Sequence, residues 1–209
     1  MGMILKQTPV GEYDRRITLL TKERGKISAF ARGARKQGSR FAASTMPFCF
    51  GNFKLFEGRE SYSLMEADIQ NYFEDLMKDY IGACYGMYFA EVADYYTREN
   101  NDEREMLKLL YQSMRAVCIP SLSRDLVKCI FELRSLKING EYPGVLAELK
   151  PSEPVVYTLN YIESSAIEKL YTFTVTAEVL KELSEICDIY RKRFVNQHFK
   201  SLEILRSMC

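Results

Sequence analysis

The sequence predicts an α+β fold, in which an N-terminal five-stranded barrel of the OB type is followed by an all-helical region carrying a small irregular or hairpin insertion. Three observations support this prediction. Short alternating apolar and polar segments fill the first seventy positions, apolar residues recur at three- and four-residue steps after about residue 73, and prolines and glycines gather between residues 139 and 163. We therefore expect a barrel over 1–73 and a helical domain over 74–209, with the insertion at 139–163.

The barrel strands are predicted from five segments rich in β-branched and aromatic residues, separated by turn-forming sequences such as Glu23-Arg24-Gly25. Strands this short suit a small closed barrel better than an open sheet. In the third segment, alternation predicts that Ala29 points into the barrel and that Phe30 points outward. The five segments cover residues 3–10, 16–23, 25–32, 53–58 and 61–69.

Three helices are expected after the barrel, because apolar residues there recur on one face of a helix. The first covers residues 76–96. The second covers 107–117 and is ended by Pro120, and the third runs from an N-cap at Ser121 or Ser123 to the Asn139-Gly140 stop signal.

The insertion is predicted from the prolines and glycines between residues 139 and 163, which interrupt any long helix. Within it, the apolar run PVVYTLNYI at 154–162 predicts one strand. Residues 164–173 then predict a short helix, and residues 176–208 predict a continuous helix.

The composition argues against catalysis and metal binding. The six cysteines include no zinc-type CxxC pair, and the single histidine, His198, is more typical of a surface or packing residue than of a ligand. The sequence has no phosphate-binding glycine loop, no GxSxG motif and no carboxylate pair spaced for acid–base work. We therefore expect a protein that is not an enzyme and that uses no metal and no cofactor.

The sequence also argues against a membrane or secreted protein. No apolar run approaches the ~20 residues that a membrane helix needs. The N-terminal residues lack the basic and apolar regions of a secretion signal. We expect a cytoplasmic protein with no membrane partner.

Charge is unevenly distributed along the chain, although the net charge is only +1. Residues 1–59 contain 12 Lys and Arg against 4 Asp and Glu, whereas residues 60–128 contain 7 against 13. Such asymmetry indicates that the basic part binds a polyanion. The densest stretch is ARGARKQGSR at 31–40, which has four cations, two glycines and no acidic residue.

This basic region has the features of a surface that binds single-stranded nucleic acid. Its cations can displace the counterions of phosphates, Gly33 and Gly38 allow close approach of the backbone, and Phe30 beside Arg32 offers a stacking surface. The predicted contact residues are Arg15, Arg16, Lys22, Arg24, Lys26, Phe30, Arg32, Arg35, Lys36 and Arg40.

Residues 11–48, GEYDRRITLLTKERGKISAFARGARKQGSRFAASTMPF, closely resemble the N-terminal barrel of the bacterial RecO family of DNA repair and recombination mediators. FELRSL at 131–136 and KSLEILRSM at 200–208 resemble its middle helical region and its last helix. The resemblance implies an OB-fold and a helical domain, binding of single- and double-stranded DNA, and annealing of complementary strands. It also implies loading of a recombinase together with RecR and the single-strand-binding protein, in the bacterial cytoplasm and at the nucleoid during repair.

One departure from the family pattern concerns zinc. Many members carry a four-cysteine zinc site between the middle and last helices, whereas residues 137–172 here contain neither Cys nor His. We therefore expect the zinc module to be missing or to be replaced by a metal-free insertion with a hairpin around Pro154–Ile162.

The resemblance further implies that the helical domain binds the acidic, apolar C-terminal tail of the single-strand-binding protein. Such a site needs an apolar floor and a cation at its rim. The predicted floor is Leu126, Ile130 and Leu133, and the predicted rim is Lys128, Arg134 and Lys137. The cations of Arg191-Lys192-Arg193 are the alternative location.

Two other functions fit the same basic region. A basic OB-fold protein can bind structured RNA in preference to single-stranded DNA. A basic loop can also dock an acidic segment of a partner protein, with no nucleic acid involved. Binding of single-stranded DNA across a series of salt concentrations distinguishes these functions from the first.

Overall fold

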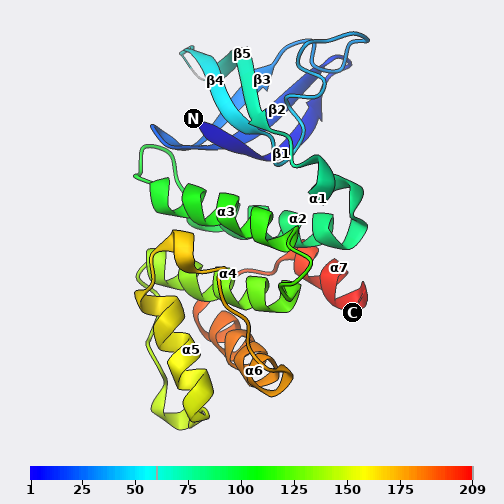
Figure 1. The fold of residues 1–209 in the computed structure, drawn as a ribbon. Helices are drawn as coiled ribbons and strands as arrows, with labels where there is room; N and C mark the ends of the chain where they lie inside the picture. The colour runs from blue at the N-terminus through cyan, green and yellow to red at the C-terminus, as the bar shows by residue number, and fades with distance from the viewer. Residues whose placement is uncertain (60, 209) are drawn as a thin grey trace.

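The computed structural model describes residues 1–59 and 61–208 and places a closed five-stranded barrel on a stack of helices (Figure 1). The strands pair in the order β1-β2-β3-β5-β4, with β3 and β5 parallel and the other pairs antiparallel. This arrangement confirms the predicted fold class. The strands are β1 (Gly2–Val10), β2 (Asp14–Thr21), β3 (Gly25–Ala31), β4 (Phe50–Glu57) and β5 (Tyr62–Asn71).

Strand alternation explains the barrel interior. In β3, Ile27, Ala29 and Ala31 are buried, while Phe30 is half-buried on the outer surface, as the sequence predicted. The interior is completed by apolar residues of the other strands and of the connection between β3 and β4. Its buried members are Ile4, Ile17, Leu19, Ile27, Ala29, Ala31, Ala34, Phe41, Cys49 and Leu64.

The helices lie in layers below the barrel, with α2 and α3 next to it, α4 beneath them, and α5 and α6 farthest away (Figure 1). The last helix, α7, packs against α2 at the right of the figure. The helices are α1 (Glu74–Lys78), α2 (Tyr80–Tyr96), α3 (Arg104–Val117), α4 (Arg124–Ile138), α5 (Glu153–Ser164), α6 (Ala177–Phe194) and α7 (Lys200–Met208). Single 3-10 turns cover Ala147–Leu149 and Ile167–Lys169.

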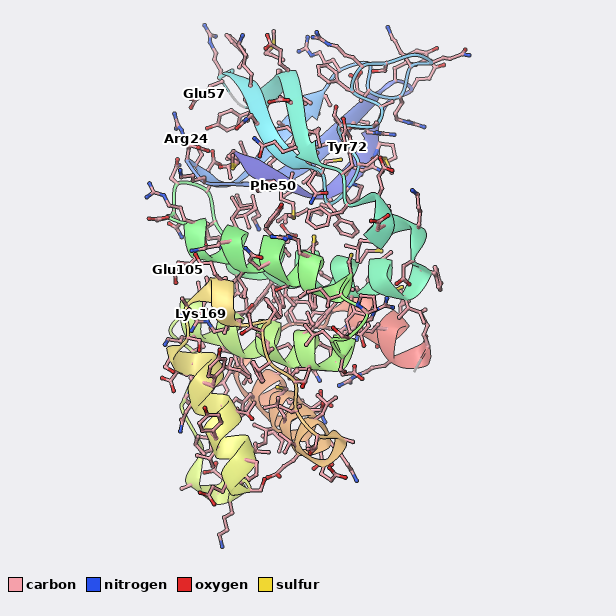
Figure 2. All side chains as sticks on the ribbon, in the orientation of Figure 1. Arg24, Phe50, Glu57, Tyr72, Glu105 and Lys169 are labelled. Atoms are coloured by element: carbon pink, nitrogen blue, oxygen red, sulfur yellow. The ribbon has the colours of Figure 1, made fainter. Side chains whose placement is uncertain are left out.

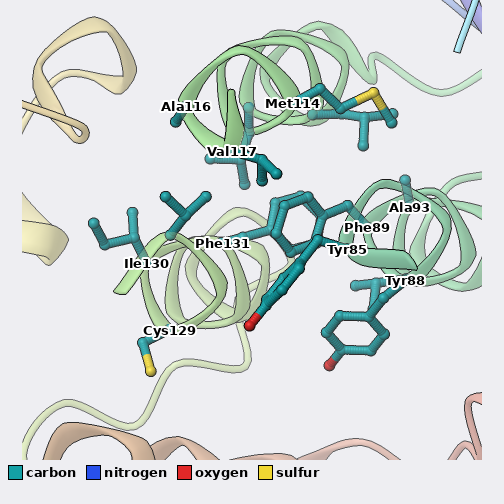
Figure 3. Close-up of a cluster of buried hydrophobic side chains, with 14 of the residues drawn as sticks. Tyr85, Tyr88, Phe89, Ala93, Met114, Ala116, Val117, Cys129, Ile130 and Phe131 are labelled. Carbon is teal, nitrogen blue, oxygen red and sulfur yellow. The ribbon is translucent and has the colours of Figure 1, made fainter. Parts of the chain in front are cut away.

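The helical core is centred on aromatic residues from α2 and α4 (Figure 3). The Phe89 and Phe131 rings lie 4.4 Å apart between centroids and are both fully buried. Tyr88 is also buried, and its hydroxyl donates to Glu132 Oε1 at 2.6 Å. The buried charge of Glu132 is compensated by this hydrogen bond together with Lys128 Nζ and Arg191 Nε, which lie 3.8 and 3.9 Å from Oε1.

The barrel and the helices form one continuous core. Met3, Leu5, Leu20 and Phe48 of the barrel are buried in the same cluster as the residues of α2 and α3. Phe50, labelled in Figure 2 where the barrel meets the helices, packs on Tyr111 of α3 with the ring centroids 4.5 Å apart. The barrel surface is thereby fixed relative to α2 and α3.

The turn between β2 and β3 is joined to the segment between α2 and α3 by backbone hydrogen bonds. Lys26 N donates to Arg98 O, and Asn100 N donates to Arg24 O, both at 2.9 Å. Gly25 lies at the centre of this joint with a φ of +64°, and a Cβ built there would overlap the Arg98 carbonyl oxygen. Only glycine combines this backbone conformation with such close contact.

Asp94 adds an ionic contact to the same junction. Lys6 Nζ lies 2.6 Å from Asp94 Oδ2, and Lys26 Nζ lies 3.0 Å from Asp94 Oδ1. Burial alone would raise the pKa of Asp94, but hydrogen bonds from the two lysines and their charges outweigh burial and lower that pKa. The carboxylate therefore stabilises the contact between β1, β3 and α2 while it is ionised.

We predict that Asp94→Asn lowers the free energy of unfolding by about 1–2 kcal/mol at pH 7, since two charge-assisted contacts lose their acceptor charge. A depressed folded-state pKa contributes stability above the unfolded-state value of about 4, and that contribution is lost as the pH falls through the folded-state pKa. The difference between parent and variant should therefore shrink as the pH falls below about 4. Urea titrations from pH 7 to pH 3 measure it, and a difference independent of pH would contradict the prediction.

The strand predicted at 154–162 is wrong, because these residues form α5. Val155, Thr158, Leu159 and Ile162 are buried at helical spacing, and Pro154 occupies the first turn, where its missing N–H costs nothing. The helix packs on α4 and α6, and this tertiary contact outweighs the strand preference of its β-branched and aromatic residues. The predicted insertion at 139–163 is irregular only up to Ser152.

Three other helix boundaries differ from the prediction. The helix expected at 164–173 is absent: Ser164 ends α5, and the residues after it contain only the 3-10 turn Ile167–Lys169. The helix expected at 76–96 is divided at Asp79, which accepts a hydrogen bond from Gly82 N. The helix expected at 176–208 is divided between α6 and α7. Glu91 of α2 accepts hydrogen bonds from Lys200 N and Ser201 N, and so begins α7 as a new helix.

Within the described part of the chain, no helix has the length and apolar character needed to cross a membrane. The same residues contain no group of three or more His, Cys, Asp or Glu arranged to hold a metal ion.

We predict that EDTA leaves the melting temperature of the purified protein unchanged. A structural metal contributes folding free energy, so its removal would lower the melting temperature. Thermal unfolding with and without EDTA, together with elemental analysis, tests this. One equivalent of zinc per chain would show that a site was missed.

Candidate nucleic-acid interface

The basic loop, residues 32–40, is the start of the folded connection between β3 and β4 and lies at the upper right of Figure 1. Three buried side chains anchor this connection in the barrel interior: Ala34, Phe41 and Cys49. Burial raises the pKa of the Cys49 thiol to about 11, so this cysteine stays neutral. The backbone of the loop is therefore held in place while its charged side chains point to solvent.

Two residues at the start of β2 hold the connection between β3 and β4, Asp14 by a contact within the basic loop and Arg15 by contacts just after it. Asp14 Oδ1 accepts a hydrogen bond from Gly33 N at 2.7 Å. Arg15 Nη1 donates to Ala42 O and to Thr45 Oγ1, both at 2.7 Å. Arg15 is half-buried and serves to order the segment that follows the basic loop, so it differs from the exposed cations with which the sequence grouped it.

The exposed cations of the basic loop are Arg32, Arg35, Lys36 and Arg40. Arg35 Nη1 donates to Gly11 O at 3.1 Å, and Arg40 Nη2 donates to Met65 O at 2.9 Å. None of the four is within ion-pair distance of a carboxylate in residues 1–59 or 61–208. Their charge is therefore not neutralised by the described chain.

Aromatic rings accompany these cations. The Lys36 ammonium lies 5.4 Å from the centre of the Tyr13 ring, and the Arg40 guanidinium lies 4.7 Å from the centre of the Phe41 ring. Tyr13 is 46% exposed, so part of its ring remains available for stacking. Sequence reasoning missed Tyr13, although its place in the GEYD turn beside β2 was a usable signal.

Arg16, which is exposed, and Phe30, which is half-buried, form a second group on the outer surface of β2 and β3, which we call the stacking pair. They are partners in the strand register, and the Arg16 guanidinium lies 6.0 Å from the centre of the Phe30 ring. Arg16 Nε also donates to Ser28 Oγ at 2.8 Å. A cation beside an outward ring matches what single-stranded nucleic acid needs from a protein surface.

The other predicted contacts are separated from the basic loop. Lys22 and Arg24 lie at the opposite end of the β2–β3 hairpin, and Arg24 pairs with Glu57 at 3.3 Å at the left of Figure 2. Lys26 is engaged with Asp94. The structure therefore brings together the basic loop and the stacking pair, whereas Lys22 and Arg24 lie apart from them and Lys26 is paired with Asp94.

The residues predicted to bind an acidic tail lie mostly inside the helical core. Leu126, Ile130 and Leu133 are at most 2% exposed, so they do not form the floor of an open pocket. Lys128 and Arg134 are also largely buried. Burial opposes the charge of Lys128, but the nearby charge of Glu132 raises its pKa and keeps it protonated.

Arg134 and Lys137 have structural partners. Arg134 Nη1 donates to the carbonyl oxygens of Ile162 and Glu163, at 3.1 and 2.6 Å, and Lys137 Nζ donates to the Glu163 carbonyl. These bonds satisfy the last carbonyls of α5. Lys137 is the exposed cation among the six predicted residues.

Comparison with known proteins identifies matching family models and similar relatives for this chain. The family model described as recombination protein O N terminal matches residues 1–73, and the one described as recombination protein O C terminal matches residues 77–147. The DNA repair protein RecO of Acetivibrio thermocellus is 27% identical, with 99% of this chain and 95% of the relative covered. Those of Clostridium novyi and Clostridium acetobutylicum are also 27% identical, with 97% and 98% of this chain and 91% and 95% of the relatives covered.

The relatives include residues that this chain lacks. The alignment with the Acetivibrio thermocellus protein has 239 positions, against 209 residues in this chain, so at least 30 positions have no counterpart here. That the segment at 139–163 takes the place of a zinc module remains a prediction.

Proposed function

Because the chain belongs to the recombination protein O family, we propose that it acts in DNA repair by binding single- and double-stranded DNA through the basic loop and the stacking pair. The observation that carries the proposal is that four exposed cations lie on an anchored loop without a described carboxylate partner. Phosphates would supply the missing negative charge and release their condensed counterions.

Annealing of complementary strands follows from the same chemistry. Two strands repel each other through their phosphates, and a basic surface that neutralises part of this charge lowers the barrier to pairing. The protein needs no catalytic group for this step, and we propose that it works as a non-enzymatic mediator in the bacterial cytoplasm and nucleoid.

Partnership with RecR and with the acidic tail of the single-strand-binding protein is part of the proposal, as is loading of the recombinase. Lys137 and Lys192 are exposed and form no ion pair with a described carboxylate, whereas Arg193, which is also exposed, pairs with Glu148. Tail-peptide binding to Lys137→Glu and to Lys192→Glu, compared with the parent, distinguishes these segments.

The test of DNA binding is fluorescence anisotropy of a labelled single strand with the full chain, across a series of salt concentrations. We expect the logarithm of the binding constant to fall linearly with the logarithm of the salt concentration. A structured RNA that competes far better than single-stranded DNA would favour an RNA-binding protein. No binding of either nucleic acid at low salt would overturn the proposal and favour the protein adaptor.

A further inference from the structure

A polar groove of about 480 Å³ lies between the outer surface of β1, β2 and β3 and the C-terminal end of α2. We call it the interdomain groove. Its walls carry hydroxyl groups and charged side chains, with one aliphatic residue among them. The lining residues are Lys6, Thr8, Arg16, Thr18, Lys26, Ile27, Ser28, Asp94, Arg98 and Glu99.

The groove has more positive than negative charge. Its four cations face two carboxylates, and Asp94 is shared by Lys6 and Lys26. The cations not paired with Asp94 are Arg16 and Arg98. Arg98 Nη1 donates to the carbonyl oxygens of Tyr95 and Thr97, at 2.5 and 2.8 Å, which orients the guanidinium without neutralising it.

The groove is continuous with the surface proposed to bind DNA. Arg16 lines the groove and also contacts Phe30. Strand β3 begins at Gly25, on the interdomain joint, and ends at Ala31, next to the basic loop. At ~3.3 Å per residue, β3 separates the interdomain joint from the basic loop by roughly 20 Å. This distance is within the span of the longer single strands that an OB-fold holds.

We propose that the interdomain groove is a second contact site for the nucleic-acid strand, in which Arg98 of the helical part binds a phosphate. The inference rests on the proposed function and extends it beyond the barrel. A single strand would run from the basic loop across the stacking pair into the groove. The Thr8 and Thr18 hydroxyls lie in the groove and can donate to phosphate or sugar oxygens.

The walls of the groove are fixed before any ligand binds. Backbone hydrogen bonds join Lys26 to Arg98 and Arg24 to Asn100, so the two sides cannot separate without breaking them. A preformed site pays little ordering entropy on binding. Arg98 can be truncated without loss of these bonds, because its backbone carbonyl makes the contact and its side chain is exposed.

The test compares Arg98→Ala with the parent, using single strands of about 4 and about 16 nucleotides, the limits of OB-fold site size. One lost phosphate contact lowers the salt slope by about 0.7, which corresponds to about a fivefold loss of affinity at 0.1 M salt. We expect this loss for the long strand and none for a short strand that the barrel alone can hold. Arg193→Ala, a charge-matched change on α6 far from the barrel, should affect neither strand.

Glu99→Gln is expected to change the affinity for the long strand in the opposite direction, so misfolding cannot explain its effect. It removes a carboxylate from the groove, and we expect tighter binding of the long strand. A parent that fails to bind DNA would overturn the proposed function itself. A parent that binds, with Arg98→Ala and Glu99→Gln both equal to Arg193→Ala, would overturn the groove alone.

Discussion

Replacing Arg32, Arg35, Lys36 and Arg40 together by alanine is expected to weaken binding of single-stranded DNA by two to three orders of magnitude at about 0.1 M salt. Each phosphate contact contributes about 0.7 to the slope of affinity against salt for single strands, so four contacts contribute about 2.8. The contribution of counterion release to the binding constant vanishes near ~1 M salt. At a tenfold lower salt concentration, the four contacts therefore contribute about 2.8 decades of affinity, which the variant loses.

The fold should survive this change. The four side chains are exposed, and the anchors of the connection, Ala34, Phe41 and Cys49, remain in place. The charge-matched control replaces four exposed lysines of the helical part by alanine: Lys150, Lys169, Lys181 and Lys192. If the loop variant and this control keep the same affinity and the same salt slope as the parent, the loop does not bind DNA.

Much of the barrel was predictable because its strands depend on local alternation. The burial of Ile27, Ala29 and Ala31 follows from a two-residue period, which sequence alone displays. The misassigned helix α5 shows the limit of this reasoning. Its β-branched residues favour a strand, and only the spacing from Val155 to Ile162, with Pro154 in the first turn, indicates a helix.

The sequence predicted which region of the candidate site is charged, but not which of its cations are exposed and which are paired within the fold. Lys26 and Arg32 look alike in the sequence, yet Asp94, 68 residues after Lys26, pairs with the first and no described carboxylate pairs with the second. Arg15 likewise resembles Arg16, but its partners Ala42 and Thr45 lie on another segment. Long-range contacts of this kind carry no local signal, so sequence reasoning could not separate exposed cations from structural ones.

The joint between barrel and helices provides a further test, because it depends on one glycine. We expect Gly25→Ala to lower the free energy of unfolding by on the order of 3 kcal/mol. Two costs add: a non-glycine residue at a φ of +64° is strained, and its Cβ overlaps the Arg98 carbonyl oxygen and lies 2.9 Å from Asn101 O. Relief requires the 98–101 segment to move, which breaks the hydrogen bonds from Lys26 N and Asn100 N.

Gly140→Ala separates the two costs. Gly140 has a φ of +72°, but a Cβ there meets no atom within 4 Å, so only the strain of about 1–2 kcal/mol should appear. Urea unfolding measures both variants, and hydrogen exchange at the Lys26 and Asn100 amides reports the joint directly. Faster exchange at those two amides is expected in Gly25→Ala and not in Gly140→Ala. Equal destabilisation by the two variants, with both amides protected as in the parent, would show that the joint tolerates a side chain and does not fix the barrel on the helices.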